Sequence, residues 1–261
     1  MQRSRKQPTR LSSIFRLLGL MVVTICLLFC WQCGGIDSEP EFSAEEIILR
    51  YLTVTGLLEN ADQFHNRLTI GRFLMPKIAY EGEVTTYTVP PDFRRMEVLQ
   101  GTEKIFSSGV KDGVAWTIDP MNGARILEGL DRLRTLRQCN FDIFLSWQLE
   151  FVAAEVERSP SDTEETPYRV VLSSRRGERL IALFDRQSGL LTRMISQAGS
   201  SRISIDISDD REVDGMLIPH LLDTDLDGIM TLQLAATSIQ HDVEIPDEVL
   251  ALPREILELR E

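Results

Sequence analysis

The sequence has few of the residue types on which catalytic and metal sites depend. Its only histidines are His65, His220 and His241, and none stands in an H-x-x-H or H-E-x-x-H spacing, which brings two imidazoles onto one side of a helix. G-x-S-x-G, P-loop and glycine-rich dinucleotide motifs are also missing. We therefore expect a protein that is not an enzyme and needs no cofactor or metal. The enzymatic alternative is a hydrolase whose carboxylate site leaves no sequence motif.

One acidic segment imitates the start of a calcium-binding loop. Asp223, Asp225 and Asp227 alternate along the chain and are followed by Gly228, which matches the oxygen ligands and the sharp turn of such loops. The carboxylate that completes a calcium loop would fall on Leu234, whose side chain has no oxygen to offer. We therefore interpret this segment as a charged hairpin turn.

Positive charge is scarce in the body of the protein. The formal net charge is −12, and five of the 28 cations lie in the first 33 residues, where there is no acid. The rest of the chain therefore carries 23 cations against 40 acids. Such a surface repels polyanions, so we expect no nucleic-acid partner. Contact with lipid would have to come through an apolar pocket.

Long apolar runs are missing, with one exception at the N-terminus. Leu17–Trp31 is almost wholly apolar and follows a basic segment over residues 1–16. A basic start followed by about 7–15 apolar residues is typical of an export signal, whereas a spanning helix needs about 20. The sequence predicts export, and it leaves open whether this segment is removed or stays as an anchor.

Cysteine is nearly absent beyond this apolar run. Cys26, Cys30 and Cys33 lie in it or just after it, and Cys139 stands alone in the body. Cys33, followed by two glycines, resembles a bacterial lipoprotein attachment cysteine, although Gln32 is larger than the small residue that this motif has before the cysteine. Lipidation at Cys33 would leave the exported body with one unpaired thiol and no disulfide. We interpret Cys139 as a buried free cysteine.

Short apolar–polar segments separated by turn residues dominate what is present. Asp112-Gly113 and Asn122-Gly123 favour tight hairpins, so successive strands should pair in an antiparallel meander. In the segment 114–118, Val114, Trp116 and Ile118 alternate with less apolar residues, which predicts one apolar face. The strands expected in this region are 83–88, 93–99, 103–110, 114–118 and 125–127.

Two helices interrupt the strands. Ser43 and Glu46 form a capping box that opens a helix ending at Gly56, and Leu130–Cys139 has apolar residues one turn apart. Beyond a polar loop over Ser159–Pro167, further half-buried antiparallel strands follow. We expect these strands at 168–173, 179–185, 190–197, 201–208, 216–221 and 229–238.

Several motifs together resemble the LolA/LolB-like family of periplasmic lipoprotein carriers. The matching segments are Gly82-Glu-Val followed by Pro90-Pro91, SGVKDGVAWTIDP (108–120), LFDRQSGLL (183–191), VDGMLIP (213–219) and the closing IPDEVLALP. The resemblance covers about residues 43–253. It implies a mainly β (α+β) fold, an incomplete antiparallel β-barrel or strongly curved sheet whose concave face is covered by Ser43–Thr55 and Leu130–Cys139. In that family, the apolar cavity between sheet and helices takes acyl chains.

The resemblance also implies a division of the chain into four segments. At one position the chain differs from the family's motif. We expect an export or lipoprotein signal or anchor at 1–33, a linker at 34–42, the open-barrel domain at 43–253 and a charged tail at 254–261. The family's carriers have a functional arginine directly before the proline that follows their second long strand, but here Val89 precedes Pro90. Arg94 and Arg95 lie nearby but outside the motif, which puts lipoprotein release in doubt.

The function predicted on this basis is non-catalytic binding in the periplasm or cell envelope. The partner would be lipid acyl chains or a lipoprotein held in the apolar cavity, since burying each methylene contributes about 0.8 kcal/mol. The alternative is a lipid-anchored regulatory or scaffolding domain that binds a protein partner in the envelope. Membrane association would then come through the N-terminal lipid or anchor. The candidate cavity residues, which could instead simply be packed core, are Trp116, Ile118, Ile203, Ile205, Met230 and Leu232.

Overall fold

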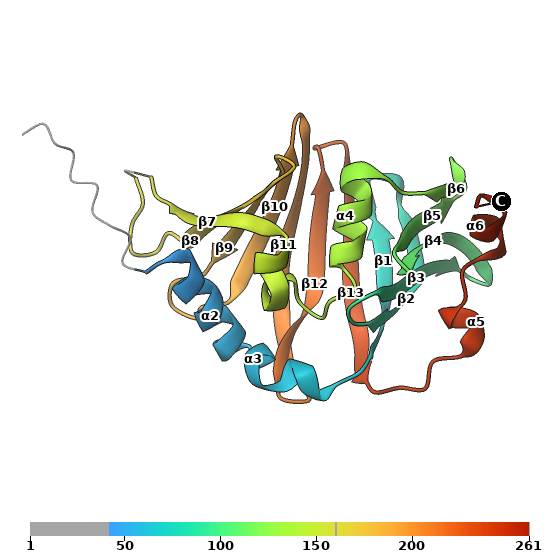
Figure 1. Ribbon diagram of the computed structural model, residues 1–261, viewed down its shortest axis with the longest axis horizontal. Coiled ribbons are helices and arrows are strands. Elements are labelled where there is room, and N and C mark those ends of the chain that lie inside the picture. The colour runs from blue at the N-terminus through green and yellow to red at the C-terminus, as the bar shows by residue number, and fades with distance from the viewer. Residues whose placement is uncertain (1–41, 160, 261) are drawn as a thin grey trace, which may run out of the picture. The chain divides into compact units, whose positions relative to one another are not determined.

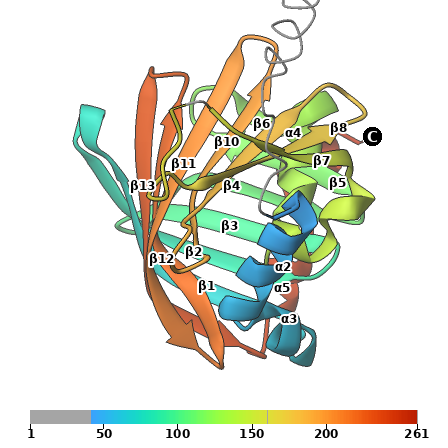
Figure 2. The same cartoon turned by 90° about the vertical axis from the view of Figure 1, so that its left-hand side faces the viewer.

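A computed structural model describes residues 42–159 and 161–260 and shows one open antiparallel sheet. Its thirteen strands, counted over this described part, follow the order β6-β5-β4-β3-β2-β1-β13-β12-β11-β10-β9-β8-β7. The two edge strands, β6 and β7, pair with one neighbour each, so the sheet does not close. The sheet curls strongly around one side, and helices α2 and α3 lie within the curve (Figures 1 and 2). The predicted fold class, an incomplete barrel with a helix-covered concave face, is confirmed.

The strands of the first half form the meander that the turn residues predict. Asp112 and Gly113, at the β4–β5 turn, both have positive φ (51° and 73°), which is the backbone of a tight two-residue hairpin. The bounds are β1 (Arg67–Met75), β2 (Tyr80–Val89), β3 (Phe93–Gln100), β4 (Glu103–Lys111), β5 (Val114–Asp119) and β6 (Gly123–Ile126). A short 3-10 helix, η2 (Pro76–Ile78), separates β1 from β2.

The second half is also a meander, and two of its strands are longer than the sequence predicts. Strands β11 and β12 continue beyond the expected ends at residues 208 and 221 and pair with each other from Ile203–Leu226 to Val213–Met216. These extensions contain charged residues, which weaken the apolar–polar alternation from which a strand is predicted. An antiparallel strand nevertheless accepts such residues on its solvated face. The bounds are β7 (Phe151–Glu157), β8 (Tyr168–Ser174), β9 (Arg179–Phe184), β10 (Leu191–Ala198), β11 (Ser201–Val213), β12 (Met216–Leu226) and β13 (Met230–His241).

The two meanders join in the middle of the sheet, where the first strand pairs with the last. β1 lies between β2 and β13, and Arg67 stands opposite both Thr88 and His241. The connection from β6 to β7 carries α4 (Gly129–Arg137) and the 3-10 helix η3 (Ile143–Leu149). Because β6 and β7 are the opposite edges of the sheet, this connection has to cross between them. It places α4 over β4 and β5 and η3 against β7.

Helix α2 (Ala44–Val54) begins at the predicted capping box. The Ser43 hydroxyl accepts from the Glu46 amide, and the Glu46 carboxylate accepts from the Ser43 amide. Gly56, with φ of 70°, ends the helix, and α3 (Leu57–Asn60) and η1 (Ala61–Gln63) follow. One face of this helix is buried against the sheet, with spacing of three or four residues between its members: Ile47, Ile48, Tyr51, Leu52 and Thr55.

The largest core lies between α2 and the concave face of the second meander. Ile48, Phe144 and Phe184 are at most 2% exposed, and the Phe144 and Phe184 rings meet edge to face with centroids 5.4 Å apart. A smaller core lies under α4, where Val110 and Ala115 pack on Cys139. Cys139 is a buried free cysteine, as predicted, and burial raises the pKa of its thiol to about 12.

The C-terminal segment covers part of the outer face. It contains α5 (Asp247–Leu250) and α6 (Arg254–Glu258). Arg95 Nη1 donates to the carbonyl oxygens of Glu248, Val249 and Ala251 at 3.0–3.1 Å. Residues 254–261, predicted as a charged tail, therefore include a helix, and its Ile256 side chain is fully buried.

The predicted export segment (1–33), Cys33 and most of the predicted linker lie outside the described residues. Within the part of the chain that the structure does describe, no helix is long and apolar enough to cross a membrane.

Candidate functional site

Strand alternation and register assign each side chain to one face of the sheet. Ile205 and Leu222 pack on the core beneath α2, so they face the concave side. Antiparallel partners share a face, and the pairs Ile203–Leu226, Ile205–Thr224, Leu226–Met230 and Thr224–Leu232 extend this assignment across three strands. The structure thus brings four of the six predicted cavity residues together on the concave face: Ile203, Ile205, Met230 and Leu232.

The other two predicted residues, Trp116 and Ile118, lie on the opposite face. Ala115 packs beneath α4 on Cys139, so its neighbour Trp116 points to the outer side. A side chain on Gly109, opposite Trp116 in the register, would meet the Trp116 ring at 2.9 Å. Trp116 is only 2% exposed, so it is buried on the outer face. The single lining predicted from the sequence is therefore divided between two faces.

Several apolar residues that the sequence analysis did not single out complete the concave set. Phe73 pairs with Leu234 and Met75 with Tyr80, which continues the same face onto β1 and β2. The Phe73 and Tyr80 rings stand edge to face at 6.2 Å. We call the following group the apolar strip: Phe73, Tyr80, Met194, Ile203, Ile205, Leu226, Met230, Leu232 and Leu234.

The apolar strip is less covered than the core beside it. Its members are half-buried, and Met230 is 39% exposed. Helices α2, α3 and α4 pack over β4, β5, β7, β8 and β12, whereas the strip runs along the turn ends of β10–β13 and the β1–β2 hairpin. Contiguous accessible apolar surface of this kind marks a binding site more often than scattered exposed residues do.

A row of polar residues crosses the concave face at the other end of β1. His241, Arg67, Thr88 and Arg94 are successive cross-strand neighbours on β13, β1, β2 and β3. Val110, which follows Arg94 in this row, packs under α4, so the row faces the concave side. We call these four residues the polar row. The pairing of β1 with β13 brings His241 beside Arg67. The sequence does not predict this pairing.

Both arginines of the polar row are poorly compensated. Burial, together with the nearby charge of Arg67, lowers the pKa of Arg94 to about 10. Burial also lowers the pKa of Arg67, against the opposing effect of Asp142. Arg67 Nη2 donates to the Phe141 carbonyl oxygen at 3.3 Å, and its guanidinium lies 5.2 Å from the centre of the Phe141 ring.

The segment above the polar row holds the nearest acid. Asp142 Oδ2 accepts from the Tyr51 hydroxyl and Oδ1 from the Phe144 amide, both at 2.7 Å. Burial raises the pKa of Asp142 above its ordinary value, although these hydrogen bonds and Arg67 oppose the shift. Because Tyr51 belongs to α2 and Phe144 to η3, this carboxyl joins the two covering elements.

The covering elements are fixed to the sheet by polar contacts. Arg50 of α2 donates to the carbonyl oxygens of Arg186 (3.0 Å) and Gln187 (2.8 Å) at the β9–β10 turn. At the C-terminal end of α2, the Leu217 amide donates to the Thr55 carbonyl oxygen at 2.8 Å. The middle and the C-terminal end of α2 are therefore held on the sheet.

Helix α4 is held by a buried ion-pair network that sequence reasoning missed. Glu178, 1% exposed, accepts from Arg137 Nη2 at 2.8 Å, Arg134 Nε at 3.2 Å and the Ser196 hydroxyl at 2.7 Å. Burial alone would raise the pKa of Glu178, but the hydrogen bonds and charges of Arg137, Ser196 and Arg134 outweigh it and lower the pKa.

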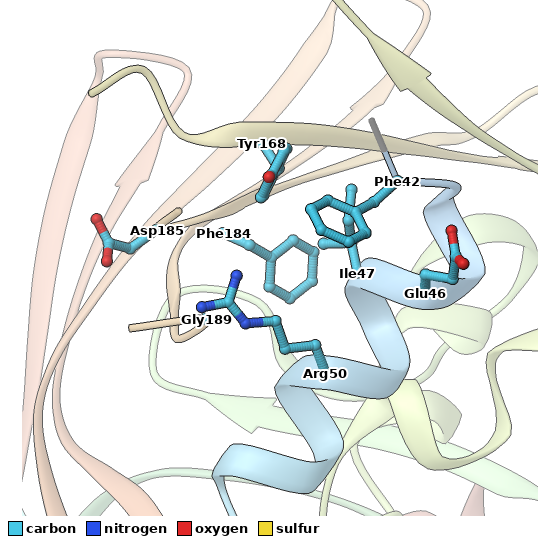
Figure 3. Close-up of a pocket in the computed structure, with 8 residues that line it drawn as sticks. All are labelled: Phe42, Glu46, Ile47, Arg50, Tyr168, Phe184, Asp185 and Gly189. Carbon is cyan, nitrogen blue, oxygen red and sulfur yellow. The ribbon is translucent and has the colours of Figure 1, made fainter. Parts of the chain in front are cut away.

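One small cavity opens beside the N-terminal end of α2 (Figure 3). It has a volume of about 160 Å³ and is walled by Phe42 and Ile47 on the helix side and by Tyr168 and Phe184 on the sheet side. Glu46, Arg50 and Asp185 stand at its edge. The cavity is separate from the apolar strip and is too small for a long hydrocarbon chain.

The acidic segment 223–228 lies at the end of β12 and in the turn that follows it. The described residues contain no group of three His, Cys, Asp or Glu side chains able to hold a metal ion. Asp227 and Gly228 form the tight β12–β13 turn, with φ of 54° and 71°. Asp225 Oδ1 accepts from the Gly228 amide at 3.1 Å. The predicted hairpin turn is confirmed.

Comparison with known proteins establishes the fold. A scan against protein-family models finds no matching family, and a search of the curated proteins finds no match. Solved structures do match. A DUF1329 family protein from Desulfovibrio piger has a TM-score of 0.56 at 11% identity, over 80% of this chain and 95% of its own.

Two further structures match over similar lengths. A LolA superfamily protein from Nitrosomonas europaea has a TM-score of 0.56 at 12% identity, over 81% of this chain and 98% of its own. An outer membrane lipoprotein-sorting protein domain from Vibrio parahaemolyticus has a TM-score of 0.50 at 6% identity, over 77% of this chain and 96% of its own. The resemblance predicted from sequence therefore holds at the level of the fold, which this chain shares with LolA superfamily proteins.

Proposed function

We propose that the protein binds the acyl chain of a lipid or lipoprotein on its concave face and acts in the cell envelope as a non-catalytic carrier or chaperone. The observation that carries this proposal is the apolar strip, which stays half-buried beside a fully packed core. Burying a strip side chain against hydrocarbon contributes about 25 cal/mol per Å² of apolar area. Its fold neighbours, among them a lipoprotein-sorting domain, support the same function.

A fluorescent fatty-acyl probe tests this proposal directly. Leu232→Glu places a charge in the strip, and we expect the Kd of the purified protein for the probe to rise at least about tenfold, because a desolvated charge disfavours apolar contact. Thr231→Glu, on the outer face of the same strand, is the matched control and should bind as the wild type does. The absence of saturable uptake by the wild type would remove the carrier function.

The same assay separates the two groups of residues predicted from sequence. Substitution of Ile205 should weaken uptake, since Ile205 faces the concave side. Trp116 lies on the outer face, so a substitution there should act only through stability. Equal and specific losses at both positions would contradict the placement of the site on one face.

We also propose that Cys33 carries a lipid that tethers the exported protein to a membrane. The motif around Cys33 and the single remaining thiol at Cys139 support this modification. Mass spectrometry of the mature N-terminus tests it. An acylated Cys33 would favour a tethered domain, whereas cleavage without acylation would favour a diffusing carrier.

A further inference from the structure

We propose that Arg67 and Arg94, with His241 beside them, form a binding site for a single anionic headgroup, a carboxylate or a phosphate, whose acyl chain lies along the apolar strip. This inference rests on the proposed function for the chain part of the ligand. The headgroup site is supported separately, by the contacts of Arg67, Arg94 and His241.

The register brings the cationic groups within reach of one anion. Arg67 and Arg94 lie on either side of Thr88, and neighbouring strands are about 4.8 Å apart, so their backbones are separated by about 10 Å. Arginine side chains are long enough to converge across that gap, with Thr88, which is 3% exposed, as the floor between them. Guanidinium groups bind carboxylate and phosphate through paired N–H donors.

Acidic partners distinguish Arg134 and Arg137 from the two arginines of the polar row. Within the described residues, no carboxylate oxygen lies within 4.0 Å of Arg67 or Arg94, whereas Arg134 and Arg137 both pair with Glu178. The one side-chain contact of Arg94 is from Nη2 to the Met96 sulfur at 3.4 Å. Arg67 Nε is buried without any hydrogen-bond acceptor. Arg67 and Arg94 are half-buried. Cations withdrawn from water without a counter-charge are costly, and a bound anion would reduce that cost.

His241 supplies another unpartnered polar atom in the same row. Its side chain is 1% exposed, and the Phe64 ring stacks on it at 4.5 Å. Nδ1 is hydrogen-bonded to Asp214 Oδ2 at 2.8 Å, while Nε2 is buried and has no partner. In the imidazolium form, Nε2–H is a donor for an anion held at Arg67, its neighbour in the register.

Asp142 does not already fill the role of this anion. Both of its oxygens accept hydrogen bonds, from Tyr51 and Phe144. Burial also raises the pKa of Asp142 above its ordinary value. Its charge acts on Arg67 from a distance without forming an ion pair.

The position of the polar row fits an amphiphile. Phe73 lies six residues beyond Arg67 on β1, about 20 Å along the strand. Phe73 pairs with Leu234 within the apolar strip. A long acyl chain can span this distance with its headgroup at the arginines and its tail among the strip residues. The ligand class is therefore an anionic amphiphile with one headgroup.

Three ligands with the same chain test the inference in the full-length protein. Calorimetry would compare dodecanoate, dodecyl phosphate and dodecanol. We expect at least one of the two anions to bind at least about tenfold more tightly than the alcohol, as charge-assisted hydrogen bonds allow. The tighter of the two identifies carboxylate or phosphate as the headgroup. Arg94→Met should abolish this preference, Arg94→Lys should keep part of it, and Arg72→Met should leave it unchanged.

Arg72 is the matched control because it lies on β1 with its side chain exposed and paired with Glu81. Equal binding of all three ligands, or an anion preference that survives Arg94→Met, would overturn the headgroup site and leave the carrier function standing. Inorganic phosphate provides a separate measurement. It should shift the Nε–H NMR signals of Arg67 and Arg94, even if the amphiphiles fail to bind and the carrier function falls. No binding of any amphiphile and no shift with phosphate would remove both.

Discussion

Two regions of the same concave face are built in opposite ways. Beneath α2, the inner side of the second meander is a dry core in which Ile48, Phe144 and Phe184 are at most 2% exposed. At the polar row, the first meander presents Arg67 and Arg94, which have no acidic partner among the described residues, beneath a segment that contributes Phe141 and Asp142. The dry core stabilises the fold, whereas we propose that the polar row binds a ligand.

The difference follows from how each region compensates its charges. Under α4, the buried Glu178 is fully engaged by Arg134, Arg137 and Ser196. Among the described residues, three buried side-chain polar atoms lack a hydrogen-bond partner, and two of them, Arg67 Nε and His241 Nε2, lie in the polar row. The third is the Tyr80 hydroxyl of the apolar strip. Native proteins satisfy nearly all buried polar groups, which supports the proposed binding of a ligand on this face.

The largest expected effect tests whether the core and the apolar strip differ in packing. Phe184→Ala should cost about 4 kcal/mol of unfolding free energy, because a fully buried ring leaves a cavity. Phe73→Ala, in the half-buried strip, should cost about 1–2 kcal/mol and weaken acyl binding. Urea denaturation of both variants measures this. Equal losses would mean that the strip is ordinary core.

The next largest effect is expected at Glu178, the buried carboxylate that pairs with two arginines. Glu178→Gln should destabilise the protein by about 3 kcal/mol at neutral pH, because it removes the buried carboxylate that Arg134 and Arg137 share and leaves Arg137 with only the half-buried Glu150. The folded protein lowers the pKa of Glu178 below its ordinary 4.5, so this stability is present above pH 4.5 and is lost as the pH falls through the lower, folded value.

The pH dependence of stability tests whether Glu178 stabilises the protein through its charge. The stability difference between wild type and Glu178→Gln should shrink in acid, as followed by denaturation at a series of pH values. A difference that is constant with pH would mean that the glutamate acts through packing and not through its charge.

The smallest effect is expected at Arg94, the cation of the polar row that has no acidic partner among the described residues. Arg94→Met replaces a cation that lacks an acidic partner by an apolar side chain of similar length, so we expect an increase in stability of about 1 kcal/mol without ligand. Thermal unfolding of the unliganded proteins measures this, and Arg72→Met should change little. A clear loss of stability in Arg94→Met would show that Arg94 is a structural residue, which would weaken its assignment to ligand binding.

Local features of the fold were predictable because their physics is local. Ser43 and Glu46 are three residues apart, and the capping box they form depends on nothing else. Asp112-Gly113 and Asp227-Gly228 mark their turns because their backbone conformations favour glycine and aspartate. The alternation around Trp116 correctly predicted the strand β5, although Ala115 and Thr117 on its other face are buried as well.

Alternation along one strand defines two faces but does not say which one the helices cover, so Trp116 and Ile118 were assigned to the wrong side. The polar row and the Glu178 network were also out of reach of sequence reasoning. Arg67 and Arg94 are 27 positions apart, and Arg137 and Glu178 are 41 apart.

The sequence alone determined the elements, their turns and their antiparallel order, because neighbouring residues fix these. Only the tertiary structure decided which face became concave and which charges stayed uncompensated on it. Both depend on β1 pairing with β13 and on the β6–β7 connection crossing the sheet. Contacts between segments so distant in the chain are set by the packing of the whole sheet.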